Sequence, residues 1–179
     1  MKICSYVMTR DTGFAPNPFH GFCTLAACTP NHQGAKLIKG DWIAGFFTDT
    51  EPPCLVYAMQ VDKIIRYDDY YRDSLFQCKK PRLSGSAEER CGDNLYHRNR
   101  SGKWIRDKGP YHQDDHSFDQ DTRYAIVYVG TRYAYFGGNA YANRLPANLN
   151  SVLNVRGIKY TRQHNPCLLY TSPSPRDRS

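Results

Sequence analysis

The sequence predicts an α+β fold with mostly antiparallel strands, helices on the outside and a long polar insertion. Two adjacent segments carry this prediction. Asp41–Phe47 is short, apolar and aromatic, and after it apolar residues recur at every second position from Leu55 to Val61. A period of two indicates a strand with one buried face. The segment between them, Thr48–Pro53, contains two acidic residues and a Pro-Pro pair, so we expect an antiparallel hairpin.

The ends of this hairpin are also visible in the sequence. Lys39-Gly40 forms the turn before the first strand, and the adjacent Ile64 and Ile65 break the alternation of the second. We therefore expect a bulge or the end of the strand near Asp62-Lys63. A basic turn, a Gly-Asp-Trp strand and a long return strand resemble small nucleic-acid-binding barrels of the PUA-like or EVE-like kind. That resemblance implies a small, mostly antiparallel PUA-like β-barrel, and it leaves function to be argued from the site.

The other elements follow from local signals. Two prolines flank Asn17, so the loop Phe14–His20 is stiff, extended and not helical. Thr29-Pro30 has the composition of a helix start, and acidic residues open a helix over Asp68–Gln77, which Pro81 stops. The remaining expected elements are strands at Lys2–Met8, Arg123–Gly130 with its partner Tyr133–Phe136, and Gly157–His164, and a helix at Pro146–Val155.

The domain organisation is simple. A chain of 179 residues can bury one proper core, and we expect a single domain over residues 1–166. Leu83–Asp121 is the long polar insertion, and a stretch this long with little periodicity is usually functional or mobile. Residues 167–179, CLLYTSPSPRDRS, resemble the translated read-through of a sequencing adapter, as occurs in metagenomic reading frames. We treat them as a non-native, disordered tail outside the fold.

The amino-acid composition limits which cellular compartment and which binding partners we expect for the protein. There is no signal peptide or apolar run of roughly 20 residues, so we expect a cytoplasmic protein that does not enter the membrane. Seven irregularly spaced cysteines are typical of buried, reduced thiols. A formal charge of +7 and fourteen tyrosines suit a nucleic-acid partner, because basic groups attract phosphate and aromatic faces stack on bases. The alternative is that the charge serves solubility.

Six short motifs occur in order along the chain: GFAPNPF (Gly13–Phe19), CTLAAC (Cys23–Cys28), GDWIAG (Gly40–Gly45), LVYAMQVD (Leu55–Asp62), GDNLYH (Gly92–His97) and YFGG (Tyr135–Gly138). Together they resemble the nucleotide modification associated domain family, second type, over Met1–Val155. That family occurs in bacteria and phages beside genes that build modified DNA bases. The resemblance implies a role in nucleotide or DNA modification, with DNA or a nucleotide as partner, and it supplies no catalytic assignment.

The first functional hypothesis is recognition of a modified or flipped base in an aromatic pocket. We expect the Asn17 loop, the Trp42 strand and Tyr96-His97 to converge on that pocket. The alternatives are core packing for the aromatic residues, plugging of the barrel end for the phenylalanines, and a solvated surface for the basic residues. The candidate base-binding residues are Asn17, Phe19, His20, Trp42, Tyr57, Asn94, Tyr96 and Trp104. The candidate phosphate contacts are Lys36, Lys39, Arg98 and Arg100.

The second hypothesis is an enzyme acting on a nucleotide or DNA base, with Asp93 and His97 as acid–base groups. His112, Asp115, His116 and Asp119 belong to the same candidate group. A metal is not expected, because the four-residue spacing of His112 and His116 falls in a segment that reads as loop. No known nucleotide-binding or hydrolase motif is present, so the sequence leaves the reaction and any cofactor unnamed. A third hypothesis is a scaffold that binds DNA-modification enzymes through Leu83–Asp121.

Overall fold

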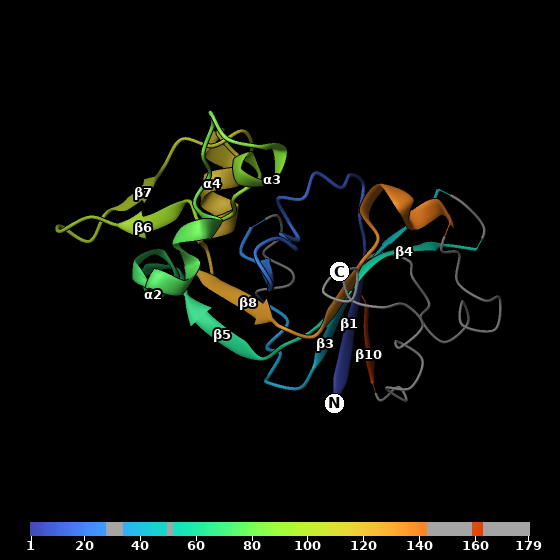
Figure 1. Ribbon diagram of the computed structural model, residues 1–179. Coiled ribbons are helices and arrows are strands. Elements are labelled where there is room, and N and C mark those ends of the chain that lie inside the picture. The colour runs from blue at the N-terminus through green and yellow to red at the C-terminus, as the bar shows by residue number, and fades with distance from the viewer. Residues whose placement is uncertain (28–33, 50–51, 143–158, 163–179) are drawn as a thin grey trace. The chain divides into compact units, whose positions relative to one another are not determined.

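The computed structural model describes residues 1–27, 34–49, 52–142 and 159–162, which pack as two compact units (Figure 1). The first unit contains Met1–Asp11, Leu37–Asp62 and the described residues from Gly130 onward. The second contains the described residues of Thr12–Lys36 and Lys63–Val129. The single domain expected over residues 1–166 stays a prediction. Together the described elements form a mixed α+β structure with few helices, as the sequence predicts.

The first unit is built on one five-stranded sheet with the order β10-β1-β3-β4-β9. The expected hairpin is confirmed: β3 pairs antiparallel with β4, with Ile43 opposite Met59 and a register shift at Gly45/Phe46. β1 and β3 are parallel, and the other pairs are antiparallel. The strands are β1 (Lys2–Val7), β3 (Trp42–Phe47), β4 (Cys54–Gln60), β9 (Tyr133–Tyr135) and β10 (Lys159–Arg162), and a 3-10 helix, η2, covers Gly137–Ala142.

Both faces of β4 are buried, so the expectation of one buried face is wrong. Val56 and Ala58, on the face expected to be polar, are as inaccessible as Tyr57 and Met59. Ala58 joins a core cluster with Trp42 and other alternate residues of β3. Apolar side chains therefore pack on both sides of the hairpin. The small residues at every second position of β4 were the sign in the sequence that this second face is also buried.

The second unit holds a three-stranded sheet, β2-β8-β5, and a separate two-stranded hairpin, β6-β7. Asp73 divides the single helix expected over Asp68–Gln77 into two, because its side chain accepts a hydrogen bond from Leu75 N and caps the second piece. The elements are β2 (Cys23–Leu25), β5 (Lys63–Arg66), α2 (Tyr67–Arg72), η1 (Ser74–Lys79), α3 (Ala87–Arg90), β6 (Tyr96–Arg98), β7 (Trp104–Arg106), α4 (Asp115–Thr122) and β8 (Ile126–Gly130).

Three further expectations have clear outcomes. Tyr133–Phe136 does not pair with the strand before it. Instead β9 pairs with β4, with Tyr135 opposite Tyr57, while β8 pairs with β5. The described strands form open sheets and no closed barrel, so the PUA-like barrel stays a prediction. The last strand is confirmed as β10, and the helices expected from Thr29-Pro30 and over Pro146–Val155 lie outside the described residues.

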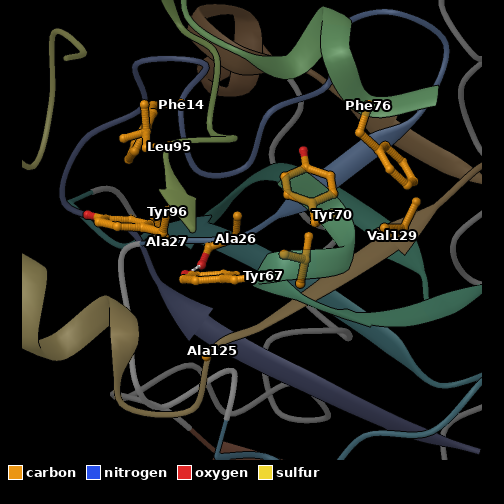
Figure 2. Close-up of a cluster of buried hydrophobic side chains, with 11 residues drawn as sticks. Phe14, Ala26, Ala27, Tyr67, Tyr70, Phe76, Leu95, Tyr96, Ala125 and Val129 are labelled. Carbon is orange, nitrogen blue, oxygen red and sulfur yellow. Dashed lines mark hydrogen bonds between the residues drawn. The ribbon is translucent and has the colours of Figure 1, made fainter. Parts of the chain in front are cut away.

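Aromatic side chains form the core of the second unit (Figure 2). The rings of Tyr67 and Tyr96 are stacked, with centroids 5.4 Å apart and planes 10° apart. The Tyr67 hydroxyl donates to Ala26 O, so its one polar atom is satisfied inside the core. Phe76 packs against Tyr70 at 4.8 Å. These contacts join α2, η1 and β6, and thereby fix the base of the β6-β7 hairpin.

A glycine at the register shift of β3 gives a test of packing in the first unit. A Cβ on Gly45 would overlap Met8 Sδ and lie 2.7 Å from Tyr57 Cε1. We expect Gly45→Ala to lower the free energy of unfolding by about 1–3 kcal/mol, because the core cannot absorb the added volume. Gly138→Ala is the control, since nothing lies within 4 Å of that Cβ. Urea unfolding curves that shift equally for both variants would contradict the packing.

Candidate functional site

A buried lysine organises the loop that contains Asn17. Lys79 is fully buried at the end of η1, and its Nζ donates to Asn17 Oδ1 at 2.6 Å, Asn17 O at 2.9 Å and Phe22 O at 2.8 Å. Asn17 Nδ2 in turn donates to Cys91 O at 2.8 Å. All three ammonium protons have acceptors in the protein. Asn17 thus holds its own loop in place, and its amide is committed to internal hydrogen bonds.

Asp93 lies in the same buried network. Thr24 Oγ1 donates to one carboxylate oxygen and Tyr70 Oη to the other, each at 2.7 Å. Burial raises the pKa of Asp93, although the nearby Lys79 charge opposes this, and burial lowers the pKa of Lys79. Both groups are therefore shifted toward their neutral forms. Asp93 is enclosed by donors of its own chain.

The GDN part of the GDNLYH motif has a structural explanation. A Cβ on Gly92 would overlap Lys79 O and lie 2.5 Å from Pro81 N, so only glycine allows this approach of two backbones. Asn94 N donates to Lys79 O, and Asn94 Nδ2 donates to Tyr70 O and Phe76 O, all at 3.0 Å. The motif thus ties the chain before β6 to η1. The structure brings Asn17, Asp93 and Asn94 together, as parts of a buried scaffold.

His97 and Tyr96 lie on β6 with different surroundings. The His97 ring stacks on Tyr71 with centroids 4.0 Å apart, and Lys80 Nζ lies 3.5 Å from the Tyr71 centroid. His97 Nδ1 is buried and has no hydrogen-bond partner among the residues that the structure describes. Burial and a 2.7 Å hydrogen bond to Asp107 raise the pKa of Tyr71 to about 12, so its phenol stays protonated at neutral pH. Tyr96 is buried.

The β6-β7 hairpin carries a concentration of positive charge. Within residues 96–106 every charged side chain is basic. The Arg98 guanidinium carbon lies 4.6 Å from the centroid of the half-buried Trp104 ring. Arg98 Nε also faces Asp68 Oδ2 at 3.9 Å, an exposed and therefore weak ion pair. The basic residues are Arg98, Arg100, Lys103 and Arg106, of which the first three are exposed.

The tip of this hairpin is rigidly built, and it projects from the second unit (Figure 1). Asn99 Oδ1 accepts hydrogen bonds from Ser101 N, Ser101 Oγ and Lys103 N at 2.8–3.0 Å. Gly102 supplies the positive φ of 82° that the turn requires. The exposed side chains of Arg100 and Lys103 therefore extend from an ordered turn. A preorganised turn loses less entropy when it binds a ligand.

The remaining candidate residues are distributed over both units. Trp42 and Tyr57 are core residues of the first unit, which also holds the exposed Lys39. In the second unit Phe19 packs on the backbone of Gly13, close enough to exclude a Cβ there, while His20 and Lys36 are exposed. The expected convergence of the Asn17 loop, Trp42 and Tyr96-His97 on one pocket stays a prediction.

Some residues of the site gave little sign of their role in the sequence. In the sequence Lys79 is one residue of the Lys-Lys-Pro segment that ends the predicted helix. Nothing there distinguishes it from its neighbour Lys80, which is half-buried in the structure. Tyr71 reads only as packing for a helix. The hairpin itself could have been found, because acid-free residues 96–106 with a Ser-Gly turn at 101–102 are visible in the sequence.

The described residues contain neither a metal-binding cluster nor a membrane-spanning helix. No group of three or more His, Cys, Asp or Glu side chains there is placed to hold a metal ion. No helix in the same part of the chain has the length and apolarity to cross a membrane. His112 lies outside α4 with a φ of +53°, so it does not share a helix face with His116.

An ordered basic hairpin with partly exposed aromatic rings defines a candidate nucleotide-binding surface. The family described as nucleotide modification associated domain 2 matches the chain over residues 1–169, and the chain belongs to this family. The protein is thereby associated with nucleotide modification, and nucleotide- or DNA-related partners are suggested. Comparisons with curated proteins and with solved structures gave no match.

Two adjacent lysines provide a matched test of the buried network. Lys79→Met leaves three oxygen acceptors and the Asp93 carboxylate buried without the ammonium group. We expect a loss of about 3–5 kcal/mol in the free energy of unfolding. Lys80→Met removes only a cation above Tyr71 and should cost about 0.5–1 kcal/mol. Urea unfolding measures both, and a Lys79→Met curve within error of Lys80→Met would contradict the network.

Proposed function

We propose that the protein binds DNA or a nucleotide through the β6-β7 hairpin and recognises a modified or flipped base there, within a nucleotide modification system. The composition of the hairpin is the observation that carries this proposal. Residues 96–106 combine exclusively basic charge with the partly exposed rings of His97 and Trp104. Phosphate contacts supply affinity, and stacking of aromatic faces on unstacked bases holds the base.

Arg100 and Lys103 are suited to the phosphate contacts. Both are exposed and both flank the Asn99 turn, so their positive charges lie at one end of the hairpin. No acidic residue interrupts them in the sequence of the hairpin. A strand of nucleic acid that crosses this end would meet fixed positive charge, and its binding would weaken with salt as condensed counterions are released.

Trp104 is suited to base stacking. In the structure the planar guanidinium of Arg98 lies over its ring, 4.6 Å from the centroid. Both a guanidinium and a base are planar groups that stack on an indole. We propose that the base takes the place of the guanidinium on Trp104. Arg98 then turns from its weak, exposed contact with Asp68 to a phosphate, where it can form a bidentate pair.

The surroundings of Asp93 favour base recognition over a reaction in which Asp93 and His97 act as acid–base groups. Both oxygens of Asp93 accept hydrogen bonds from Thr24 and Tyr70 in a fully buried network. A general base must lie within hydrogen-bond reach of the proton that it removes. Asp93 meets this requirement only for its own chain's hydroxyls, so we assign it to positioning the segment that leads into β6.

The test is a set of binding isotherms for oligonucleotides with and without modified bases at two salt concentrations. We expect tighter binding of a modified oligonucleotide that persists at the higher salt. Trp104→Ala should remove about 1–3 kcal/mol of binding free energy for every sequence that stacks a base. Arg100→Gln with Lys103→Gln should instead lower the salt slope by about 2 and leave the preference for the modified base intact.

Arg90→Gln is the control, because Arg90 is an exposed arginine of the same unit that donates to Gly85 O and lies outside the hairpin. It should leave base selectivity unchanged. Circular dichroism of each variant separates lost binding from lost folding. If the hairpin variants and Arg90→Gln weakened binding equally, or if plain and modified oligonucleotides bound alike, the recognition proposal would fail. Capture of a modification enzyme without nucleic-acid binding would favour the scaffold instead.

A further inference from the structure

A second cluster of polar side chains in the same unit includes the buried Tyr96 of β6 but none of the exposed residues of the hairpin. Asp121, in the last turn of α4, is buried, and its Oδ2 lies 2.6 Å from His112 Nδ1 and 2.7 Å from Tyr96 Oη. The side chain of His112 is 21% exposed, whereas that of Asp121 is 1% exposed. A buried carboxylate therefore orients a histidine that reaches solvent. The sequence placed Asp115 and Asp119 beside this histidine and missed Asp121.

The hydrogen bonds of Asp121 assign the proton on His112. An ionised carboxylate can only accept, so the proton of a neutral imidazole lies on Nδ1, in the bond to Oδ2. The lone pair then lies on Nε2, the nitrogen on the opposite side of the ring. A histidine held in this tautomer by a buried carboxylate has the arrangement of a general base with its orienting group.

The backbone at His112 is held in an uncommon conformation. His112 has a φ of +53°, in the left-handed region that non-glycine residues seldom adopt. Three consecutive carbonyl groups accept from the one guanidinium of Arg106: His112 O at 2.9 Å, Gln113 O at 2.6 Å and Asp114 O at 2.6 Å. An outlier fixed by surrounding contacts suggests that its geometry serves a function.

The His112 ring has aromatic neighbours. Phe14 packs on one side of His112, with ring centroids 5.0 Å apart, and on Tyr111 at 5.3 Å. Phe14 is buried, whereas Tyr111 is partly exposed. An aromatic residue that reaches solvent next to an oriented imidazole offers a stacking face beside a proton acceptor. A base taken out of its stack is held by aromatic faces and hydrogen-bonded through its polar edge, so such a pair of groups suits a nucleotide.

We propose that His112, Asp121 and Tyr96 form a proton-transfer site, at which His112 Nε2 is the general base toward an O–H or N–H group of a nucleotide. The proton passes from the nucleotide to Nε2, and the ligand oxygen or nitrogen keeps the electron pair of the broken bond. The Nδ1 proton stays in its hydrogen bond to Asp121, whose negative charge stabilises the imidazolium. Asp121 and Tyr96 are positioning residues. The proposal goes beyond base recognition and uses none of the exposed residues to which base recognition is assigned.

The tautomer is the first test, because it can be read in the wild-type protein. Nitrogen-15 chemical shifts of the histidine side chains at a pH where His112 is neutral should show a protonated Nδ1 and an unprotonated Nε2. A protonated Nε2 would overturn the proposal. This measurement needs no variant and no knowledge of the reaction. If His112 Nδ1 instead accepted a hydrogen bond, the proton of the neutral ring would lie on Nε2 and the pattern would be reversed.

Reactivity is the second test. Diethyl pyrocarbonate acylates the imidazole nitrogen that carries the lone pair, and peptide mass spectrometry resolves His112 from the exposed reference His20. Asp121→Asn should slow acylation of His112 relative to His20 by about tenfold or more, because an amide can donate to Nδ1 and move the proton to Nε2. Tyr96→Phe keeps the His112–Asp121 bond and should change the ratio by less than about twofold. An unchanged ratio in Asp121→Asn would contradict the proposal.

The ligand class has its own outcome. Millimolar deoxynucleoside 5′-monophosphates should slow the acylation of His112 in the wild-type protein and leave that of His20 unchanged. Inorganic phosphate at the same concentration is the control and should not protect. Equal protection by phosphate, or none by any mononucleotide, would overturn a nucleotide as the ligand. Either result would leave the hairpin proposal standing, since that rests on Trp104 and the basic residues of the hairpin.

Discussion

One buried ammonium group is the constraint on which the second unit depends. Lys79 Nζ has three oxygen acceptors in the loop that begins at Thr12, and its own backbone carbonyl accepts from Asn94 N. A buried charge without partners is costly, so the loop, η1 and the chain before β6 have to assemble together. Asp93 adds a carboxylate of opposite charge to the same network. Catalytic chemistry is thus not needed to explain why these polar residues are buried.

The buried scaffold holds the hairpin in the ordered conformation that the proposed binding needs. Stacked Tyr67 and Tyr96 fix the base of β6, and Asn99 fixes the turn, so the basic side chains between them extend from an ordered frame. Tyr96 connects this frame to the second site, because its hydroxyl donates to the Asp121 carboxylate that orients His112. The recognition surface and the proton-transfer site therefore share one buried tyrosine while using different exposed residues.

The sequence predicted local elements better than their partners. The β3-β4 hairpin and the first strand follow from periodicity and turn residues, which are local signals. Pairing of β9 with β4 instead of the strand before it, and the parallel pairing of β1 with β3, depend on long-range packing that no local pattern reports. For the site, the sequence motifs single out Asn17, Asp93 and Tyr96, and the structure places all three in buried hydrogen-bond networks. Their roles could not be read, because burial decides whether a polar side chain meets a ligand or another residue.

We propose that the base contacts the hairpin and not the aromatic core. The protein has two tryptophans, Trp42 in the core of the first unit and Trp104 on the hairpin, so two indole N–H signals report on the two possibilities. The most direct measurement is a titration of nitrogen-15-labelled protein with a modified-base oligonucleotide, followed by proton–nitrogen correlation spectra. We expect the Trp104 indole and the amides of residues 96–106 to shift and the Trp42 indole to stay unchanged. Shifts at Trp42 with an unperturbed hairpin would contradict the proposal.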